Sequence, residues 1–226
     1  MLLQPACLLW DMDGTLIDSQ NLHYESWHQA FQTIGVEITY SQFKETFGSN
    51  NHRVISSFLG YEPTPTSFDE LSNLKESLFR ELAPNHAQPF PGVLRWLQFF
   101  KDLGIPQGIA SSAPSENIET IVKIFHLRSF FQVILSGINL PSKPDPAIFL
   151  KGAAELNCPP DLSVVLEDSI AGLQAGRAAG MVTVGLTSTY ARNQLDADII
   201  IEDFLAEPEA FHKHLCKVIA RQSKMR

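Results

Sequence analysis

Short runs of consecutive apolar residues alternate with amphipathic stretches over most of the chain. The first run, at residues 7–10, contains no polar position and fits a strand buried on both faces, as in a parallel sheet. Further runs of this kind lie at residues 109–110, 133–135, 164–166, 182–186 and 199–201. Stretches with helical spacing separate them, at residues 93–103, 115–125, 146–156 and 170–179. This alternation predicts an α/β fold, a Rossmann-like parallel sheet with right-handed crossovers.

The segment that follows the first run has a different pattern, with helical spacing and no strong strand. Apolar and aromatic residues recur every three or four positions over residues 20–34, and helical pieces continue to about residue 83. We therefore expect two domains: an α/β core formed by residues 1–18 and 84–226, and an inserted α-helical domain at residues 19–83.

Composition excludes several classes of protein. The chain has 226 residues, 44% of them hydrophobic, and a net charge of −8, with no basic run before its last few residues, so we expect no nucleic-acid partner. No apolar run approaches membrane-spanning length, and no basic segment precedes the first run, so neither a membrane partner nor a signal peptide is expected. The three cysteines are widely spaced, which favours buried thiols in the cytoplasm over disulfides or a zinc site. The oligomeric state stays open, with a monomer as the simplest arrangement.

Polar side chains follow four of the expected strands. They are Asp11 and Asp13, Ser111 and Ser112, Lys143, and Glu167 with Asp168. Each group by itself has a structural explanation, such as a turn, a helix cap or a solvated surface. However, ligands bind outside the carboxyl ends of the strands in an open α/β sheet, so all of these groups should face one crevice. Their convergence predicts a functional site.

Such a crevice would hold several carboxylates close together. Like charges at short range repel each other and raise pKa values unless a cation compensates them. Mg²⁺ suits this role, because it takes one or two carboxylates and leaves positions for water and a substrate phosphate. Lys143 and the Ser111 hydroxyl could hold the remaining phosphate oxygens. The pattern therefore predicts Mg²⁺-dependent phosphoryl transfer on a small phosphorylated metabolite.

The motifs DMDGT, the serine after GIA, the lysine of PSKPDP and the acidic pair of VLEDS resemble the four motifs of the haloacid dehalogenase superfamily. They occur in the same order over nearly the whole chain. The segments WDMDGTLIDSQNLHYESW and VLEDSIAGLQAGRAAGM are especially similar to the β-phosphoglucomutase-like branch. The resemblance implies a core of this superfamily's fold, with the helical insert acting as a cap that closes over the site and recognises the leaving group.

The resemblance also implies catalytic roles. Asp11 would be the nucleophile that forms an aspartyl-phosphate. Asp13 would protonate the leaving oxygen and later deprotonate the attacking water. Lys143 would neutralise Asp11 and the transferring group. His23 stands where β-phosphoglucomutases carry a histidine near the catalytic acid, although a first-turn surface histidine is an equally good interpretation.

Further roles concern the phosphate and the metal. Ser111 and the Ser112 N–H would bind the phosphoryl group. Mg²⁺ would be bound by Asp11, by the backbone carbonyl of Asp13 and by Asp168, with Glu167 assisting directly or through water. Dehalogenases of the superfamily need no metal, but the acidic residues at positions 13, 167 and 168 favour phosphotransfer.

Two departures from the mutase pattern bear on the activity. Asn51 and Phe47 stand where mutases carry Arg and Lys for a sugar's second phosphate, and Ala113-Pro114 stands where mutases have Ser-Lys. A bisphosphate intermediate would find fewer cations here. We therefore expect a phosphatase acting on a sugar phosphate or a similar ester, with a β-phosphoglucomutase as the first alternative. A phospho-ligand sensor without activity is a weaker alternative, because Asp11 and Asp13 are intact.

Overall fold

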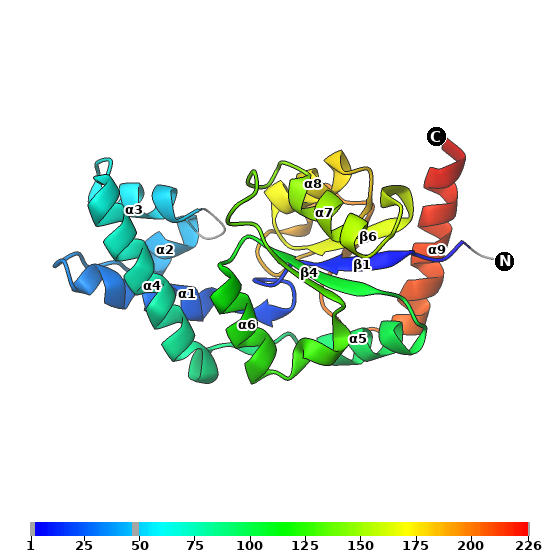
Figure 1. The fold of residues 1–226 in the computed structure, drawn as a ribbon, viewed down its shortest axis with the longest axis horizontal. Helices are drawn as coiled ribbons and strands as arrows, with labels where there is room; N and C mark the ends of the chain where they lie inside the picture. The colour runs from blue at the N-terminus through cyan, green and yellow to red at the C-terminus, as the bar shows by residue number, and fades with distance from the viewer. Residues whose placement is uncertain (1–2, 47–49, 226) are drawn as a thin grey trace. The chain divides into compact units, whose positions relative to one another are not determined.

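The computed structural model describes residues 3–46 and 50–225 (Figure 1). The chain divides into an α/β unit, residues 1–18 and 88–226, and a helical unit, residues 19–87. The expected boundary at residue 83 falls inside helix α4, Pro65–His86. Pro84 lies in the last turn of that helix and interrupts only the end of its hydrogen-bond ladder. The position of Phe47 lies outside the described residues.

A six-stranded sheet forms the centre of the α/β unit, in the order β5-β4-β1-β6-β7-β8. The strands are β1 Cys7–Trp10, β4 Gln107–Ser111, β5 Val133–Ser136, β6 Ser163–Glu167, β7 Val182–Leu186 and β8 Ile199–Ile201. Every neighbouring pair is parallel. After β1 the chain builds β4 and β5 on one side and then β6, β7 and β8 on the other. The direction of winding therefore reverses at β1, where ligands bind in sheets of this kind.

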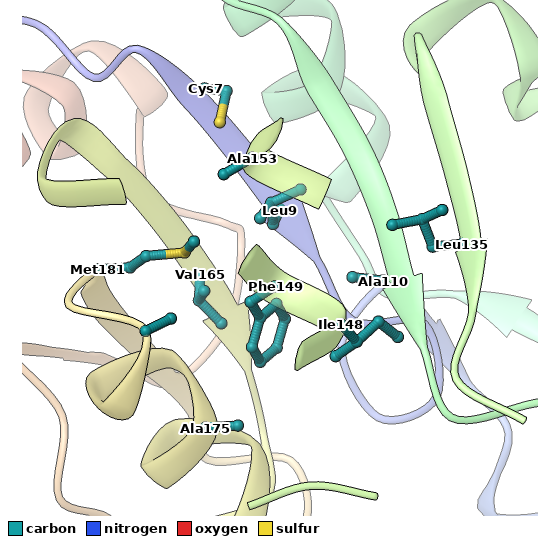
Figure 2. Close-up of a cluster of buried hydrophobic side chains, with 11 residues drawn as sticks. Cys7, Leu9, Ala110, Leu135, Ile148, Phe149, Ala153, Val165, Ala175 and Met181 are labelled. Atoms are coloured by element: carbon teal, nitrogen blue, oxygen red, sulfur yellow. The ribbon is translucent and has the colours of Figure 1, made fainter. Parts of the chain in front are cut away.

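Helices cover the sheet on both faces. They are α5 Val93–Asp102, α6 Ser115–Ile124, α7 Ala147–Glu155, α8 Ile170–Ala178 and α9 Pro208–Met225, and the short 3₁₀ turns are η1 Leu127–Phe130, η2 Pro160–Leu162 and η3 Arg192–Gln194. On one face, Leu9 and Val165 of the sheet pack against Phe149 of α7 (Figure 2). On the other face, the Trp10 ring lies 5.9 Å from Phe204. Alternate residues of β1 thus serve two cores, which explains its wholly apolar sequence.

A two-stranded antiparallel ribbon marks the points where the chain leaves and re-enters the α/β unit. Its strands are β2, Ile17–Asp18, and β3, Gln88–Pro89. The Phe90 N–H also donates to the Leu16 carbonyl, at 3.1 Å. The two ends of the long insertion are therefore held side by side within this unit.

The helical unit consists of α1 Gln20–Gln32, α2 Tyr40–Thr46, α3 Asn51–Leu59 and α4. Its own core is rich in aromatic and β-branched residues, among them Trp27, Phe31, Phe43 and Ile55. The helical spacing seen in the sequence is what places these side chains on inward faces. Within the described parts of the chain, no helix is long and apolar enough to cross a membrane.

Candidate active site

The carboxyl ends of the three central strands bring the first site residues together. Trp10 at the end of β1 pairs with Ile109 of β4 and Leu166 of β6. The next residue, Asp11, donates its backbone N–H to the Leu166 carbonyl at 3.0 Å. Glu167, the last residue of β6, therefore lies beside Asp11 at the point where the winding of the sheet reverses.

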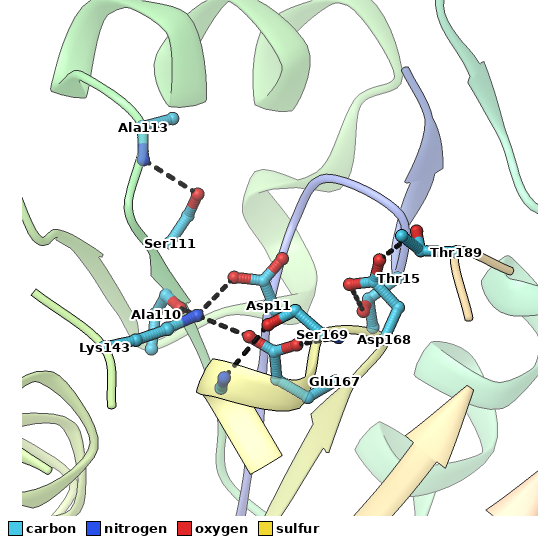
Figure 3. A network of polar contacts seen from close by, with 11 residues as sticks. Asp11, Thr15, Ala110, Ser111, Ala113, Lys143, Glu167, Asp168, Ser169 and Thr189 are labelled. Carbon is cyan, nitrogen blue, oxygen red and sulfur yellow. Dashed lines mark hydrogen bonds and ion pairs between the residues drawn. The ribbon is translucent and has the colours of Figure 1, made fainter. Parts of the chain in front are cut away.

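Lys143 lies between two carboxylates (Figure 3). Its Nζ donates to Asp11 Oδ1 at 2.6 Å and to Glu167 Oε1 at 2.8 Å, and also to the Ala110 carbonyl at 3.3 Å. The same Nζ lies 4.9 Å from the centre of the Phe149 ring. The side chains of the lysine and the two acids are all at most 10% exposed. The three residues therefore form a buried, charge-assisted hydrogen-bond network.

The pKa values in this network follow from burial and from an excess of acids. Burial alone would lower the pKa of Lys143, but Asp11 and Glu167 raise it above its ordinary value, so the ammonium stays charged. Burial raises the pKa of Asp11 to about 7, with Lys143 opposing the shift and Glu167 adding to it. Burial also raises the pKa of Asp168 well above its ordinary value, and the charges of Glu167 and Asp11 raise it further. One ammonium is therefore shared among more carboxylates than it can neutralise.

A tight turn follows Asp11 and places Gly14 against Asp168. The Met12 carbonyl accepts the backbone N–H groups of residues 15, 16 and 17. Gly14 has φ +78°, and a Cβ at this position would lie 2.1 Å from Asp168 Oδ2. Only glycine has both the conformational freedom and the small volume that this contact requires. Asp13 is half-buried in the same turn.

Hydroxyl groups hold the Asp168 carboxylate. Thr15 donates to Oδ1 at 3.3 Å, and Thr189 makes a short hydrogen bond to Oδ2. The neighbouring Ser188 donates to the Gly14 carbonyl. Ser188 and Thr189 were not predicted from the sequence, although they follow strand β7 just as the recognised groups follow their strands.

Glu167 has a different set of partners from Asp168. Its Oε1 accepts from Lys143, and its Oε2 accepts the backbone N–H of Ser169 at 2.6 Å. A Cβ on Gly172 of α8 would lie 1.8 Å from Oε1, so a glycine is needed to make room for this carboxylate. Both Glu167 oxygens are thus engaged inside the protein, and its assistance to a metal stays a prediction.

The expected phosphate-binding serines lie at the end of β4. Ser111 is buried, and its Oγ accepts the backbone N–H of Ala113 at 3.2 Å. Ser112 follows with an exposed side chain. Because Ser111 ends β4 beside β1, its hydroxyl lies at the same edge of the sheet as Asp11. Hydroxyl and N–H groups at this edge are suitable donors for phosphate oxygens.

The donor set fits a magnesium ion. Within the described residues, no three His, Cys, Asp or Glu side chains are grouped as a ready-made metal cage. Mg²⁺ seldom uses such a cage, because it keeps several waters and takes one or two carboxylates. Asp11 and Asp168 are buried carboxylates with raised pKa values, and a nearby cation would relieve that electrostatic cost. The site therefore offers oxygen ligands and an excess of negative charge, and both features favour binding of a hard divalent cation.

In the helical unit, a second buried charge pair involves residues that sequence analysis did not select. Lys75 Nζ lies 2.9 Å from Glu76 Oε1, which also accepts a hydrogen bond from Asn51 Nδ2 at 2.9 Å. The ring of His23 lies 4.8 Å from that of Phe79. Burial would raise the pKa of Glu76, but Lys75, Asn51 and His23 together lower it. His23 therefore belongs to a polar network within the helical unit.

Comparison with known proteins places this geometry in a family. The haloacid dehalogenase-like hydrolase family matches residues 8–186. The chain belongs to this family. The motifs predicted that membership, and the prediction of a hydrolytic enzyme with this α/β fold is confirmed with it.

Individual members of the family show how widely the similarity extends. Hexitol phosphatase B of Escherichia coli K12 is 31% identical over 199 residues, which cover 84% of this chain and 87% of that one. The β-phosphoglucomutase of Bacillus subtilis is 28% identical over 204 residues, covering 86% and 88%. The crystal structure of a hydrolase of this family from Entamoeba histolytica has a TM-score of 0.85 at 25% identity, covering 95% of this chain and 99% of that one.

Proposed function

We propose that the chain is a Mg²⁺-dependent phosphatase that hydrolyses a small phosphomonoester, such as a sugar phosphate, through an aspartyl-phosphate on Asp11. The observation that carries this proposal is the buried Asp11–Lys143–Glu167 network beside Asp168, at the reversal point of the sheet. Membership of the hydrolase family and the similarity to a hexitol phosphatase support it.

In the first half-reaction, an oxygen of the Asp11 carboxylate attacks phosphorus, and the bond between phosphorus and the ester oxygen breaks. Lys143 keeps Asp11 oriented, because it donates to Oδ1 and leaves the other oxygen available for attack. The positive charge of Lys143 also stabilises the negative charge that accumulates on the phosphoryl oxygens. Asp13 gives its proton to the departing alkoxide.

In the second half-reaction, the same Asp13, now a carboxylate, takes a proton from a water molecule. The resulting hydroxide attacks phosphorus and frees both phosphate and the Asp11 carboxylate. Ser111 and the Ser112 N–H hold the phosphoryl oxygens throughout. The half-buried turn position of Asp13, two residues after the nucleophile, suits both proton transfers.

The residues that would hold the metal are Asp11, the backbone carbonyl of Asp13 and Asp168. When bound, Mg²⁺ supplies positive charge that stabilises the transferring phosphoryl group. Glu167 supports the site indirectly by fixing Lys143.

The second candidate activity is that of a phosphomutase, which the similarity to β-phosphoglucomutase favours. A mutase must hold a bisphosphate by its non-reacting phosphate, normally with cations. Asn51, one position that differs from the mutase pattern, is already hydrogen-bonded to Glu76, and the neighbouring Lys75 has its charge compensated by the same carboxylate. The helical unit thus offers little free positive charge at this network, and we prefer hydrolysis.

A phosphorus NMR experiment separates the two activities. The protein with Mg²⁺ is given β-glucose 1-phosphate and a bisphosphate primer, and separately a panel of sugar phosphates and polyol phosphates. We expect phosphate release from at least one ester and little glucose 6-phosphate. If isomerisation exceeds phosphate release by about tenfold or more, the chain is a mutase. The variant Asn51→Arg should strengthen binding of bisphosphates if position 51 reads the second phosphate.

A further inference from the structure

The loop after strand β7 contacts two groups that belong to the family motifs, the Gly14 carbonyl and the Asp168 carboxylate. β7 lies next to β6 in the sheet, and Glu167 pairs with Gly185. The chain leaving β7 therefore runs beside Asp168. Two adjacent residues of this loop reach the site: Thr189 donates to Asp168 Oδ2, and Ser188 donates to the Gly14 carbonyl (Figure 3 shows Thr189).

We propose that Thr189 and Ser188 are positioning residues for the metal: together they fix the Asp168 carboxylate and the Asp13–Gly14 backbone in the orientation that binds Mg²⁺. This inference rests on the proposed function. It concerns a loop outside the residues to which the motifs assign roles. The two hydroxyls will be called the β7 clamp.

The Asp168 carboxylate is held in one orientation. Its side chain is buried, with one hydroxyl on each carboxylate oxygen, Thr15 on Oδ1 and Thr189 on Oδ2. Gly14 packs against Oδ2 so closely that a Cβ would clash. The carboxylate therefore cannot rotate without losing two hydrogen bonds. Each oxygen has two lone pairs, so each keeps one for a cation while it accepts from a threonine.

Ser188 lies next to the backbone turn that carries the expected metal ligand. The backbone carbonyl expected to bind the metal belongs to Asp13, and the next carbonyl along the chain, that of Gly14, accepts the Ser188 hydroxyl. Fixing one peptide group limits rotation of its neighbour, especially next to a glycine with its wide conformational range. Ser188 thus restrains the most flexible point of the turn that carries the expected ligand.

Ser188 and Thr189 are adjacent in sequence, but they contact two segments, around Gly14 and at Asp168, that lie far apart in the sequence. Groups hydrogen-bonded to metal ligands typically change metal affinity about 10–100-fold when they are removed, because the ligands lose their orientation. A purely structural role for Thr189 would instead change the unfolding midpoint and leave Mg²⁺ affinity unchanged. This difference makes the proposal testable.

The test is a calorimetric titration of substrate-free protein with Mg²⁺, repeated with Mn²⁺ and followed by electron paramagnetic resonance. We expect Thr189→Val to weaken binding about tenfold or more. Thr189→Ser keeps the hydroxyl and should bind like the wild type. Thr187→Val is the matched control: it makes the same change in the same loop, at a residue whose backbone N–H pairs with Ile201. Urea unfolding of each variant without metal shows whether the fold is intact.

Ser188→Ala is a second variant for the Mg²⁺ titration, because Ser188 is exposed and its truncation should not impair folding. This variant should also bind Mg²⁺ more weakly, while its free energy of unfolding stays at the wild-type value. Wild-type affinity in both Thr189→Val and Ser188→Ala would overturn the β7 clamp and leave the proposed function standing. A wild-type protein that binds neither ion, and turns over fully after chelation, would overturn the proposed function, and the clamp with it.

Discussion

At the scale of single residues, the candidate site holds three buried acids and one buried lysine. Lys143 compensates Asp11 and Glu167, whereas Asp168 relies on hydroxyl groups for its hydrogen bonds. Without a cation, such a cluster lowers the stability of the folded protein, because like charges are held together in a site of low polarity. Catalytic groups are often kept at such a cost to stability.

Asp11→Asn should abolish turnover, because an amide cannot replace the attacking carboxylate. The variant should nevertheless be at least as stable as the wild type in metal-free buffer. Burial raises the pKa of Asp11 to about 7 from 3.8, so the folded state binds this proton more tightly than the unfolded state. The free energy of unfolding of the wild type therefore falls as pH rises from about 4 to about 7. Urea unfolding in EDTA across this range should show the advantage of the variant growing with pH.

Lys143→Met should remove activity and lower the free energy of unfolding by about 3–5 kcal/mol at neutral pH, since it leaves buried carboxylates without their partner. Adding Asp11→Asn to the same chain removes one of those charges. The double variant should recover part of the lost stability and none of the activity. Equal stability of the single and double variants would show that the unpaired Asp11 carboxylate is not what destabilises Lys143→Met.

The residues that sequence analysis identified and those that it missed differ in a simple way. Lys143 and Asp168 stand in recognised motifs, and their geometry agrees with the expected convergence. Thr189 follows a strand in the same manner, but a threonine in a polar loop resembles any turn residue. Lys75 lies in an amphipathic helix, where lysine is normally solvated. Its burial depends on the aromatic rings of Trp27 and Phe79, each 5.5 Å from its Nζ.

At the scale of elements, helix α8 combines two tasks. Ser169 caps its N-terminus by accepting the backbone N–H of Gly172, at 3.0 Å. Gly176 lets the same helix approach the sheet, where a Cβ would lie 3.0 Å from Thr183. Gly172 has an additional role, because it makes room for the Glu167 side chain.

Gly172→Ala tests that additional role. Alanine normally stabilises a helix by up to about 1 kcal/mol relative to glycine. Here the new Cβ would fall within 1.8 Å of Glu167 Oε1, so the carboxylate must move away from Lys143. We expect at least a tenfold loss of kcat, measured under saturating Mg²⁺. In the control Gly152→Ala, the new Cβ would meet the flexible end of Leu9, and activity should be retained.

The helical unit offers a matched pair of charge deletions. Glu76→Gln leaves Lys75 buried without its counter-charge, and should lower the free energy of unfolding by about 3 kcal/mol. Glu62→Gln removes the exposed partner of His52, whose side chain is 57% exposed, and should change stability by less than about 0.5 kcal/mol. Urea unfolding of both variants at pH 7 measures the difference. Similar stabilities would mean that the introduced amide still satisfies the buried lysine.

Element boundaries were harder to predict than element types. The central strands were recognised because a strand buried on both faces has an unbroken apolar sequence. Strand β4 begins at Gln107, a polar residue whose side chain donates to the Leu97 carbonyl and accepts from Trp10, so hydropathy alone could not include it. Helix α9 was not anticipated, since its apolar positions are interspersed with charged residues near the end of the chain.

At the scale of the whole molecule, the expected activity depends on a metal. Chelation with EDTA should abolish phosphate release, and added Mg²⁺ should restore it. Ca²⁺ should inhibit, because it accepts looser and higher coordination and would hold the phosphate in the wrong position for attack. Phosphate release after dialysis against each ion measures both effects. Full activity after exhaustive chelation would indicate the metal-free chemistry of dehalogenases.

The position of β1 in the sheet has a consequence for the order in which the protein is made. β1 leaves the ribosome before the other strands of its sheet, and its neighbours β4 and β6 follow only after the whole helical unit has been synthesised. The helical unit is one continuous segment with contacts close in sequence, so it can fold while the rest is still emerging. During this time β1 is an apolar segment without strands to pair with. Nascent chains that end before residue 163 should therefore bind chaperones through residues 7–10, and release from them should coincide with the arrival of β6.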